Sequence, residues 1–338
     1  MSIGGPFSAL SAFFGRLRPT PSAWDEIRGS VREAPALALV GFEPDESPPI
    51  WRFRNPRYRG QLIGCCGGES IAAMCETTAR TPPGWTVIND AKPVDPYPNY
   101  SPLWIYWVGR KYSEDHGRSL RGQEGSILSD NLSAVVESGL ISYDAWPATV
   151  ENYRRYDDNR PPSNVSREPT VRPAGEARLL TSPDLVLQYL GAGYSVVVGM
   201  DWRGGMTVGP NGWCSWDQRP IGGHAFELLG YSKTQNYMVI GNSWDNAGWG
   251  AQPADPRRPR GWAMCPLDQF MRAMTADAMR SGMVEALVIT EVGSDDVPKP
   301  VPDPPPPPPP PPPPTPRPTV VVTVTIGGVV YSGPVPRI

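Results

Sequence analysis

The fold of this chain is decided by the stretch GQLIGCCGGESIAAMCE, which spans residues 60–76. Ile71, Met74 and Cys75 recur at helical spacing directly after the glycine-rich turn GCCGG, which predicts a helix over 68–80. A cysteine attacks a carbonyl only as a thiolate, and a helix N-terminus lowers a thiol pKa by stabilising that negative charge. The stretch therefore places a candidate nucleophile at the start of a helix.

Two more helices are predicted in the first half of the chain. Ser101 is a suitable N-cap for SPLWIYWVGRKY, and Pro102 then occupies the first helical turn. SILSDNLSAVVESGL, residues 126–140, carries an apolar stripe and ends near Gly139, a residue typical of helix C-termini. The first half of the chain is therefore interpreted as helical.

The hydrophobic period changes to two in the second half. A short helix with Ser182 as N-cap and Pro183 in its first turn precedes this change. Runs of β-branched and aromatic residues, bounded by glycine and asparagine turns, then predict strands over 194–201, 224–231 and 237–240. Helices followed by antiparallel strands indicate an α+β fold with two lobes, and a cleft between lobes is where a site is expected.

Three chemically related features follow one another along the chain. They are the Cys65-Cys66 pair at a predicted helix start, His224 at the beginning of a predicted strand, and Asn242 in GNSWDNAGWG. The imidazole can act as the base for a thiol, and an asparagine oxygen can fix the imidazole tautomer. Trp244 is placed to shield that hydrogen bond from water. Order and setting predict a thiol nucleophile, its base and the residue that orients the base.

Four stretches carry a resemblance to the papain family of cysteine peptidases. GQLIGCCGGESIAAMCE resembles the nucleophile segment, GGHAFELLGY the histidine strand and IGNSWDNAGWG the asparagine segment. YSPLWIYWVGRKY, followed by EGSILSDNLSAVVESGLISYDAWP, resembles the helical lobe of bacterial and viral members. The resemblance covers about residues 50–292. It implies a papain-like α+β fold with a helical lobe over about 60–150, an antiparallel β-rich lobe over about 151–292 and a cleft between them.

The resemblance also implies a function and a set of site residues. The chain is expected to hydrolyse peptide bonds in a peptide or protein substrate through a Cys-His-Asn triad and an acyl-enzyme. Cys66 is the expected nucleophile, because Gly64, Gly68 and Glu76 then fall where family members often carry the same residues. Cys65 remains the alternative nucleophile. The expected catalytic partners of Cys66 are His224, Asn242 and the oxyanion donor Gln61, with Trp244 as the shield.

The nucleophile segment departs from the family pattern in two ways. Gln61 precedes Cys66 by five residues, one fewer than is usual, and Gly67 stands where the family commonly has Trp or Val. These departures favour a competing hypothesis. In that hypothesis the chain is a catalytically inactive papain-like homologue that serves as a structural or binding module in a larger assembly, such as a viral one.

The remaining cysteines and histidines predict neither a metal site nor a cofactor. Cys75 and Cys265 are interpreted as core residues, while Cys214 and His116 are assigned to surface loops. The two histidines, His116 and His224, lie far apart, and no CxxC pair occurs.

Composition limits the class and location of the protein. A formal net charge of −3 and a hydrophobic content of 39% argue against a disordered chain and against a strongly basic nucleic-acid binder. The sequence has no run of about 18 apolar residues and no charged segment before its first apolar patch, so neither membrane insertion nor a signal peptide is expected. Five cysteines in a long chain favour a reducing compartment. The expected location is the cytoplasm or a viral particle.

Proline content sets the domain boundaries. Residues 1–58 are interpreted as an N-terminal arm and 59–292 as the peptidase-like domain. A proline-rich linker over 293–318, with eleven consecutive prolines, follows this domain. Thr and Val alternate in the C-terminal tail, residues 319–338, as far as Gly327-Gly328, where a hairpin turn is predicted. Two strands alone are marginally stable, so the tail is expected to pair with a protein partner or another copy of itself.

Overall fold

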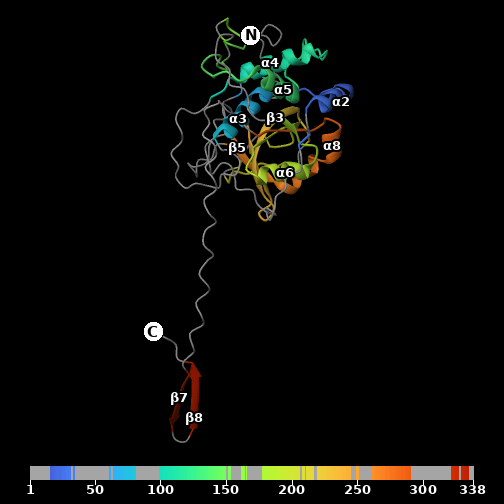
Figure 1. The fold of residues 1–338 in the computed structure, drawn as a ribbon. Helices are drawn as coiled ribbons and strands as arrows, with labels where there is room; N and C mark the ends of the chain where they lie inside the picture. The colour runs from blue at the N-terminus through green and yellow to red at the C-terminus, as the bar shows by residue number, and fades with distance from the viewer. Residues whose placement is uncertain are drawn as a thin grey trace, which may run out of the picture. The chain divides into compact units, whose positions relative to one another are not determined.

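A computed structural model gives the architecture of the chain. It describes residues 16–31, 33–34, 61, 64–80, 99–149, 151–153, 161–163, 165, 177–205, 208–209, 211–216, 219–244, 249–250, 261–290, 321–326 and 329–334. The chain divides into two units, Met1–Val297 and Pro298–Ile338 (Figure 1). The proline-rich linker, residues 293–318, lies outside the described residues.

The three helices predicted in the first half are confirmed. They are α3 (Cys66–Arg80), α4 (Pro102–Asp115) and α5 (Leu128–Ser138). The Ser101 side chain accepts a hydrogen bond from the Trp104 N–H at 3.2 Å and caps α4, whose first turn holds Pro102. Gly139, at φ 79°, ends α5. These ends were predictable because capping depends on neighbouring residues.

Glycine allows the helices to approach one another closely. A Cβ at Gly68 in α3 would lie 2.3 Å from the carbonyl oxygen of Pro102, and a Cβ at Gly109 in α4 would lie 1.8 Å from Asn131 Oδ1. Any larger residue at these positions would force the helices apart. Gly68, two residues after Cys66, therefore allows the start of α3 to lie against α4.

A six-stranded antiparallel sheet forms the second half of this unit, in the order β1-β6-β2-β3-β4-β5. The strands are β1 (Ala177–Leu179), β2 (Val196–Asp201), β3 (Gly223–Ser232), β4 (Tyr237–Gly241), β5 (Trp262–Pro266) and β6 (Glu285–Ile289). β2, β3 and β4 confirm the predicted strands. The sequence pattern did not single out β1, β5 or β6.

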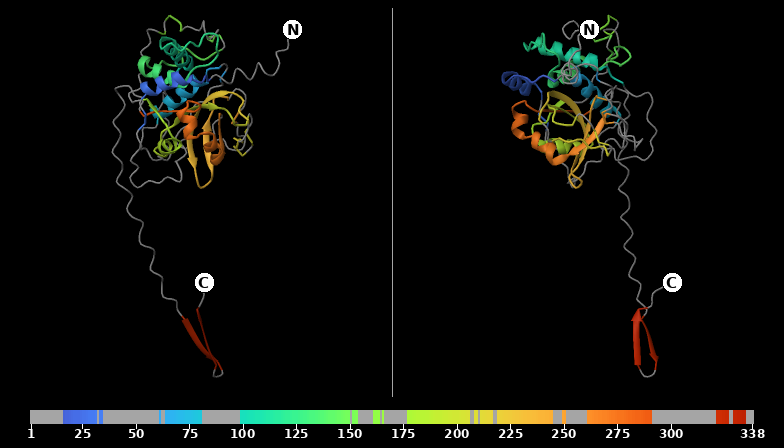
Figure 2. Two further views of the ribbon diagram at one scale, coloured as in Figure 1. Left: turned by 90° about the vertical axis from the view of Figure 1, so that its right-hand side faces the viewer. Right: turned by 180° about the vertical axis from the view of Figure 1, so that it is seen from behind.

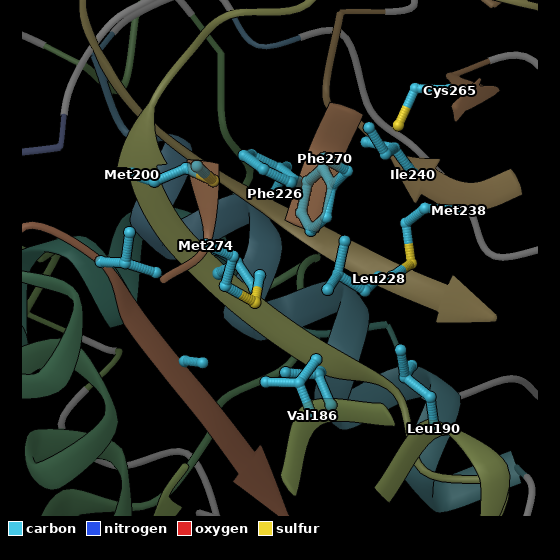
Figure 3. Packing of buried hydrophobic residues seen from close by; sticks show 14 of the residues in the cluster. Val186, Leu190, Met200, Phe226, Leu228, Met238, Ile240, Cys265, Phe270 and Met274 are labelled. Carbon is cyan, nitrogen blue, oxygen red and sulfur yellow. The ribbon is translucent and has the colours of Figure 1, made fainter. Parts of the chain in front are cut away.

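Helices cover both faces of the sheet (Figure 1, Figure 2). The predicted helix α6 (Pro183–Gly191), together with α7 (Leu267–Ala273) and α8 (Ala276–Arg280), contributes to one hydrophobic core. Figure 3 shows Val186, Phe270 and Met274 from these helices and the segment after α7, packed near Phe226 and Leu228 of β3. The second core lies under α3, α4 and α5 and includes Ala225 of β3. Alternate residues of β3 thus face different cores.

The N-terminal arm contains regular structure, which the prediction of an arm without periodicity had missed. Helix α2 (Pro21–Ser30) is capped by the Thr20 hydroxyl, which accepts from the Ala23 N–H at 3.3 Å. Trp24 and Ile27 are each 2% exposed and belong to the second core. Regular structure therefore begins well before residue 60. The start of α2, Thr20-Pro21, carries the same kind of capping signal as Ser182-Pro183, so this helix was within reach of the sequence.

The prediction for Cys214 is wrong, because this cysteine is buried. Its N–H donates to the Met264 carbonyl at 2.8 Å, and its side chain belongs to the core that also contains Cys265. Cys75 and Cys265 are buried, as predicted, and His116 is exposed at the end of α4. None of the five cysteines forms a disulfide.

The second unit contains the predicted hairpin. Strands β7 (Val321–Ile326) and β8 (Val329–Pro334) pair antiparallel, with Ile326 opposite Val329. This register leaves two residues, 327–328, for the turn, and these lie outside the described residues. Across the described parts of both units, every helix is too short or too polar to cross a bilayer.

Candidate active site

His224 and Asn242 are brought together by adjacent strands. His224 is the second residue of β3, and Asn242 directly follows β4, its antiparallel neighbour. The imidazole Nε2 and Asn242 Oδ1 lie 2.8 Å apart. Because an amide oxygen only accepts hydrogen bonds, Nε2 carries the proton in this arrangement. Nδ1 is then the nitrogen that accepts a proton in the neutral ring.

Aromatic rings enclose the imidazole. The Trp244 ring centroid lies 4.7 Å from that of His224, and the Trp202 centroid lies 5.3 Å away at an interplanar angle of 86°. Both indoles are buried. Trp244, the residue expected to shield the hydrogen bond, lies against the imidazole. Trp202 was not singled out, because nothing near it in the sequence marks it as a neighbour of His224.

Gln61 is tied to the segment that carries Asn242. Its N–H donates to the Ser243 carbonyl at 2.6 Å, and its side-chain Oε1 accepts from the Ser243 hydroxyl at 2.8 Å. Anchoring Oε1 in this way fixes the rotation of the amide and hence the direction of its N–H groups. Ser243 thus contacts both the main chain and the side chain of Gln61, a link that no sequence motif marks.

The two adjacent cysteines occupy different environments. Cys66 is the first residue of α3, a helix that packs against β3 and shares a core with Ala225, the neighbour of His224. Cys65 precedes the helix. Burial raises the pKa of the Cys65 thiol well above its usual value, and the Glu69 carboxylate raises it further. These surroundings keep Cys65 protonated.

Glu124 supports the loop before the cysteine pair. Its Oε1 accepts from the Gly64 N–H at 2.9 Å, and a Cβ at Gly64 would lie 2.8 Å from the Glu124 side chain. The chain entering α3 is therefore held against the segment that precedes α5. Glu124 lies in a stretch assigned to the helical lobe, but its contact with Gly64 has no local sequence signal.

The candidate site is closed to solvent. Cys66 and His224 are each 0% exposed, and Gln61 and Asn242 are each 1% exposed. Among the described residues no group of three or more His, Cys, Asp or Glu is arranged to hold a metal ion. The described contacts thus join His224 to Asn242 and Gln61 to Ser243 in surroundings from which water is excluded.

Comparison with known proteins reveals the fold but no sequence match. Neither the protein-family models nor the curated proteins searched match this sequence. The structure resembles xylellain, a cysteine protease from Xylella fastidiosa, with a TM-score of 0.53 and 17% identity over 84% of this chain and 97% of that chain.

Two proenzymes show the same likeness. Digestive procathepsin L2 proteinase from Tenebrio molitor larval midgut has a TM-score of 0.53 and 15% identity, covering 84% of this chain and 80% of that chain. Procathepsin B S9 from Trypanosoma congolense has a TM-score of 0.51 and 14% identity, covering 84% and 88%. The helices packed on a six-stranded antiparallel sheet are thus the α+β fold of the papain-like cysteine proteases.

Proposed function

We propose that the chain is a cysteine peptidase in which Cys66, His224 and Asn242 form the catalytic triad. The observation that carries this proposal is the 2.8 Å bond between His224 Nε2 and Asn242 Oδ1 inside an aromatic enclosure. A structural histidine needs a hydrogen-bond partner but no particular tautomer. Here the partner directs the basic Nδ1 away from Asn242, as a general base for a thiol requires.

Cys66 is the proposed nucleophile. Its position at the first residue of α3 exposes the thiolate to the partial positive charge of the helix N-terminus, which favours ionisation. Burial raises the pKa of the Cys65 thiol and the Glu69 carboxylate raises it further, which opposes the role of nucleophile for Cys65. The structural surroundings therefore support the same nucleophile as the sequence register.

Gln61 is the proposed oxyanion donor. The Ser243 hydroxyl holds its Oε1, so the side-chain N–H groups are already oriented when the substrate arrives. Preorganised donors stabilise the developing negative charge without reorganising during the reaction. The backbone N–H of Cys66 would supply the second hydrogen bond.

The proposed reaction has two stages. The Cys66 proton passes to His224 Nδ1, and the thiolate attacks the peptide carbonyl to form a tetrahedral oxyanion. Collapse breaks the C–N bond, while the imidazolium returns the proton to the leaving amine and a thioester remains on Cys66. Water, deprotonated by His224, then attacks the thioester, releases the carboxylic acid and restores the thiol.

The complete burial of Cys66 and His224 favours one competing function, that of an inactive module with a papain-like fold. The two hypotheses are separated by labelling the reduced full chain with an epoxysuccinyl thiol inhibitor and mapping the modified peptide. Labelled casein supplies the parallel test of hydrolysis. If the chain is a peptidase, the inhibitor is expected to stop casein hydrolysis and to label Cys66. The Cys66→Ala variant is expected neither to hydrolyse casein nor to take the label.

Cys65→Ala is the matched control and is expected to keep most hydrolysis and the label. Label on Cys65 alone would move the nucleophile to that residue. A chain that takes no label and leaves casein intact in the presence of reductant would favour the inactive module.

A further inference from the structure

A fully buried ion pair lies beside the candidate site. Arg16 Nη2 and Glu285 Oε2 are 2.9 Å apart, and both side chains are 0% exposed. Arg16 Nε donates to the same oxygen at 3.1 Å, while its Nη2 and Nη1 donate to the carbonyl oxygens of Gly282 and Met283 at 2.9 and 3.2 Å. The pocket thus surrounds a guanidinium with one carboxylate and two carbonyl acceptors.

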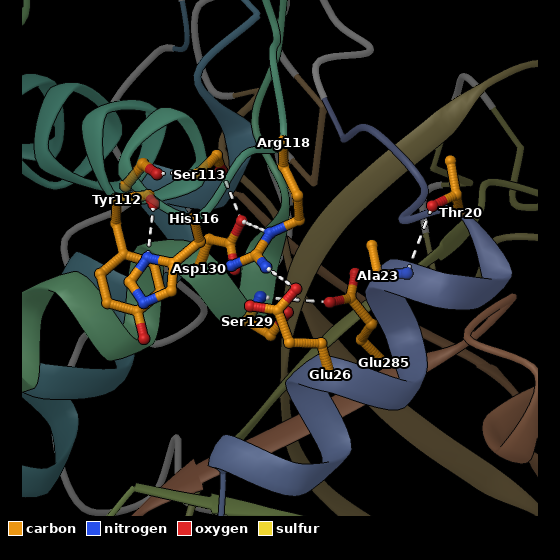
Figure 4. A network of polar contacts seen from close by, with 11 residues as sticks. Thr20, Ala23, Glu26, Tyr112, Ser113, His116, Arg118, Ser129, Asp130 and Glu285 are labelled. Atoms are coloured by element: carbon orange, nitrogen blue, oxygen red, sulfur yellow. Dashed lines mark hydrogen bonds and ion pairs between the residues drawn. The ribbon is translucent and has the colours of Figure 1, made fainter.

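The walls of this pocket are shaped to admit a long side chain. A Cβ at Gly199 in β2 would lie 3.0 Å from Arg16 Nε and 3.0 Å from the Leu128 side chain, so glycine leaves the space that the arginine fills. The other oxygen of Glu285 accepts from the Ser129 N–H at 3.1 Å, a contact shown in Figure 4. Glu285 is therefore held in place independently of Arg16.

The main chain of Arg16 binds next to the candidate base. The Arg16 N–H donates to the Gly223 carbonyl at 3.2 Å, and Gly223 immediately precedes His224. On the other side, the Leu17 N–H donates to the Ser126 carbonyl at 2.8 Å. A Cβ at Gly223 would lie 2.5 Å from the Arg16 carbonyl oxygen, so a glycine is needed for this approach.

A second arginine of the same segment also meets an acid. Arg18 forms an ion pair with Asp201 at the end of β2. Arg18 stands two residues after Arg16, and its side chain is 47% exposed, in contrast to the buried side chain of Arg16. The sequence Arg-Leu-Arg is thus bound by two carboxylates and by hydrogen bonds from its main chain.

We infer that the surface formed by Ser126, Asp201, Gly223 and Glu285, here called the groove, binds peptides with basic side chains. Arg16–Arg18 occupies this groove as a tethered ligand. Backbone hydrogen bonds combined with side-chain pockets are a general mode of recognising extended peptides. The inference rests on the proposed function and names its substrate class. Glu285 selects an arginine close to the scissile bond, and Asp201 favours a second basic residue two positions along.

Stability alone is a weak explanation for this pocket. Well-packed apolar residues often stabilise a fold as well as a buried ion pair does. The main chain of Arg16 also binds the Gly223 carbonyl, directly before His224 in the sequence, so the segment that carries the ion pair adjoins the strand of the candidate base. Because the segment is part of the chain, its effective concentration is high, on the order of millimolar, and an external peptide must displace it.

Binding is tested with the full chain carrying Cys66→Ala, which prevents hydrolysis, and Arg16→Gln, which removes the tethered charge. The probe is fluorescein-labelled RLRPT, copied from residues 16–20, and the control peptide has citrulline in place of its first arginine. We expect fluorescence anisotropy to show at least about tenfold tighter binding of the arginine peptide. Adding Glu285→Gln is expected to remove this preference, whereas Glu137→Gln, at an exposed position on α5, keeps it.

Equal binding of the two peptides, or a preference that survives Glu285→Gln, would overturn the inference. If Arg16→Gln prevents folding, calorimetric titration of the chain carrying Cys66→Ala alone with millimolar peptide decides in the same way, since excess peptide competes with Arg16. Hydrolysis by the chain without substitutions separates the two claims. Cleavage with no arginine preference contradicts only the inference that the groove selects basic peptides. Selective binding with no cleavage contradicts only the proposed peptidase function.

Discussion

The side chains of the candidate site depend on one another through short hydrogen bonds. His224 and Asn242 are 18 residues apart in the sequence, and their bond of 2.8 Å determines which imidazole nitrogen is basic. Trp202 and Trp244 keep water from competing for that proton. The loss of the base and the loss of the residue that orients it should therefore have different effects.

His224→Ala is expected to lower kcat by at least about 100-fold, as much as Cys66→Ala, because residues of a catalytic unit act together. Asn242→Ala removes only the tautomer preference and should retain part of the activity. The measurement is steady-state hydrolysis of labelled casein under reductant. His116→Ala, on an exposed residue, serves as the control, and normal turnover by the His224 variant would refute the papain-like mechanism.

Cys214 shows why some residues could not be placed from sequence. Its neighbours Gly, Trp and Ser resemble a loop, but a hydrogen bond to Met264, 50 residues away in the sequence, directs it into the core. The same limit applies to Arg16 and Glu285, whose pairing over 269 residues leaves no local pattern. His224 and Asn242 were found only because each carries a recognisable local motif.

Burial of Cys214 predicts a loss of stability at alkaline pH. Burial raises the pKa of this thiol to about 12 from a usual value of 9.0, so the unfolded chain loses its proton first as pH rises above 9. The contribution of the buried Cys214 thiol to the free energy of unfolding is complete below pH 9. It falls by about 2 kcal/mol as the pH rises to 10.5. Urea unfolding at these pH values should show a smaller fall for Cys214→Ala, and parallel pH profiles would contradict the assignment.

At the scale of elements, local signals specified helix ends better than strand membership. Ser101-Pro102 and Ser182-Pro183 gave the starts of α4 and α6, because capping involves residues three apart or fewer. By contrast, the three residues of β1 are held only by pairing with β6. Tertiary contacts decide such elements, and a single sequence carries little trace of them.

The approach of α3 to α4 gives a prediction at this scale. Gly68→Ala should destabilise the first unit by roughly 1–3 kcal/mol, because its Cβ would lie 2.3 Å from the Pro102 carbonyl oxygen and backbone must move. Thermal unfolding by circular dichroism measures the effect. Glu137→Ala, at an exposed helical site, is the control and should change stability little. An unchanged melting temperature for Gly68→Ala would show that the two helices tolerate separation.

At the scale of the whole molecule, the division into two units separates the candidate site from the C-terminal hairpin. Every described site residue lies within Met1–Val297, and β7 pairs with β8 inside Pro298–Ile338. A two-stranded hairpin is marginally stable by itself and has strand edges available for pairing. We therefore propose that the hairpin mediates attachment to a partner or to another copy.

Truncation after Val297 is expected to leave casein hydrolysis and the cooperative melt unchanged while altering assembly. Light scattering of the full and truncated chains at equal concentration measures the assembly state. A pull-down with the isolated tail fused to a carrier tests partner binding. Loss of the cooperative melt on truncation would show instead that the tail is part of the catalytic fold.

The bond between Ser243 and Gln61 has a consequence for how activity develops during folding. It spans 182 residues, so Gln61, the proposed oxyanion donor, is positioned only after the polypeptide from Gln61 to Ser243 has been made and folded. Contacts of such long sequence separation form slowly, since a large loop must close before they are gained. If the proposed function holds, a nascent or partly refolded chain therefore lacks a competent site and does not expose its own unfolded segments to hydrolysis.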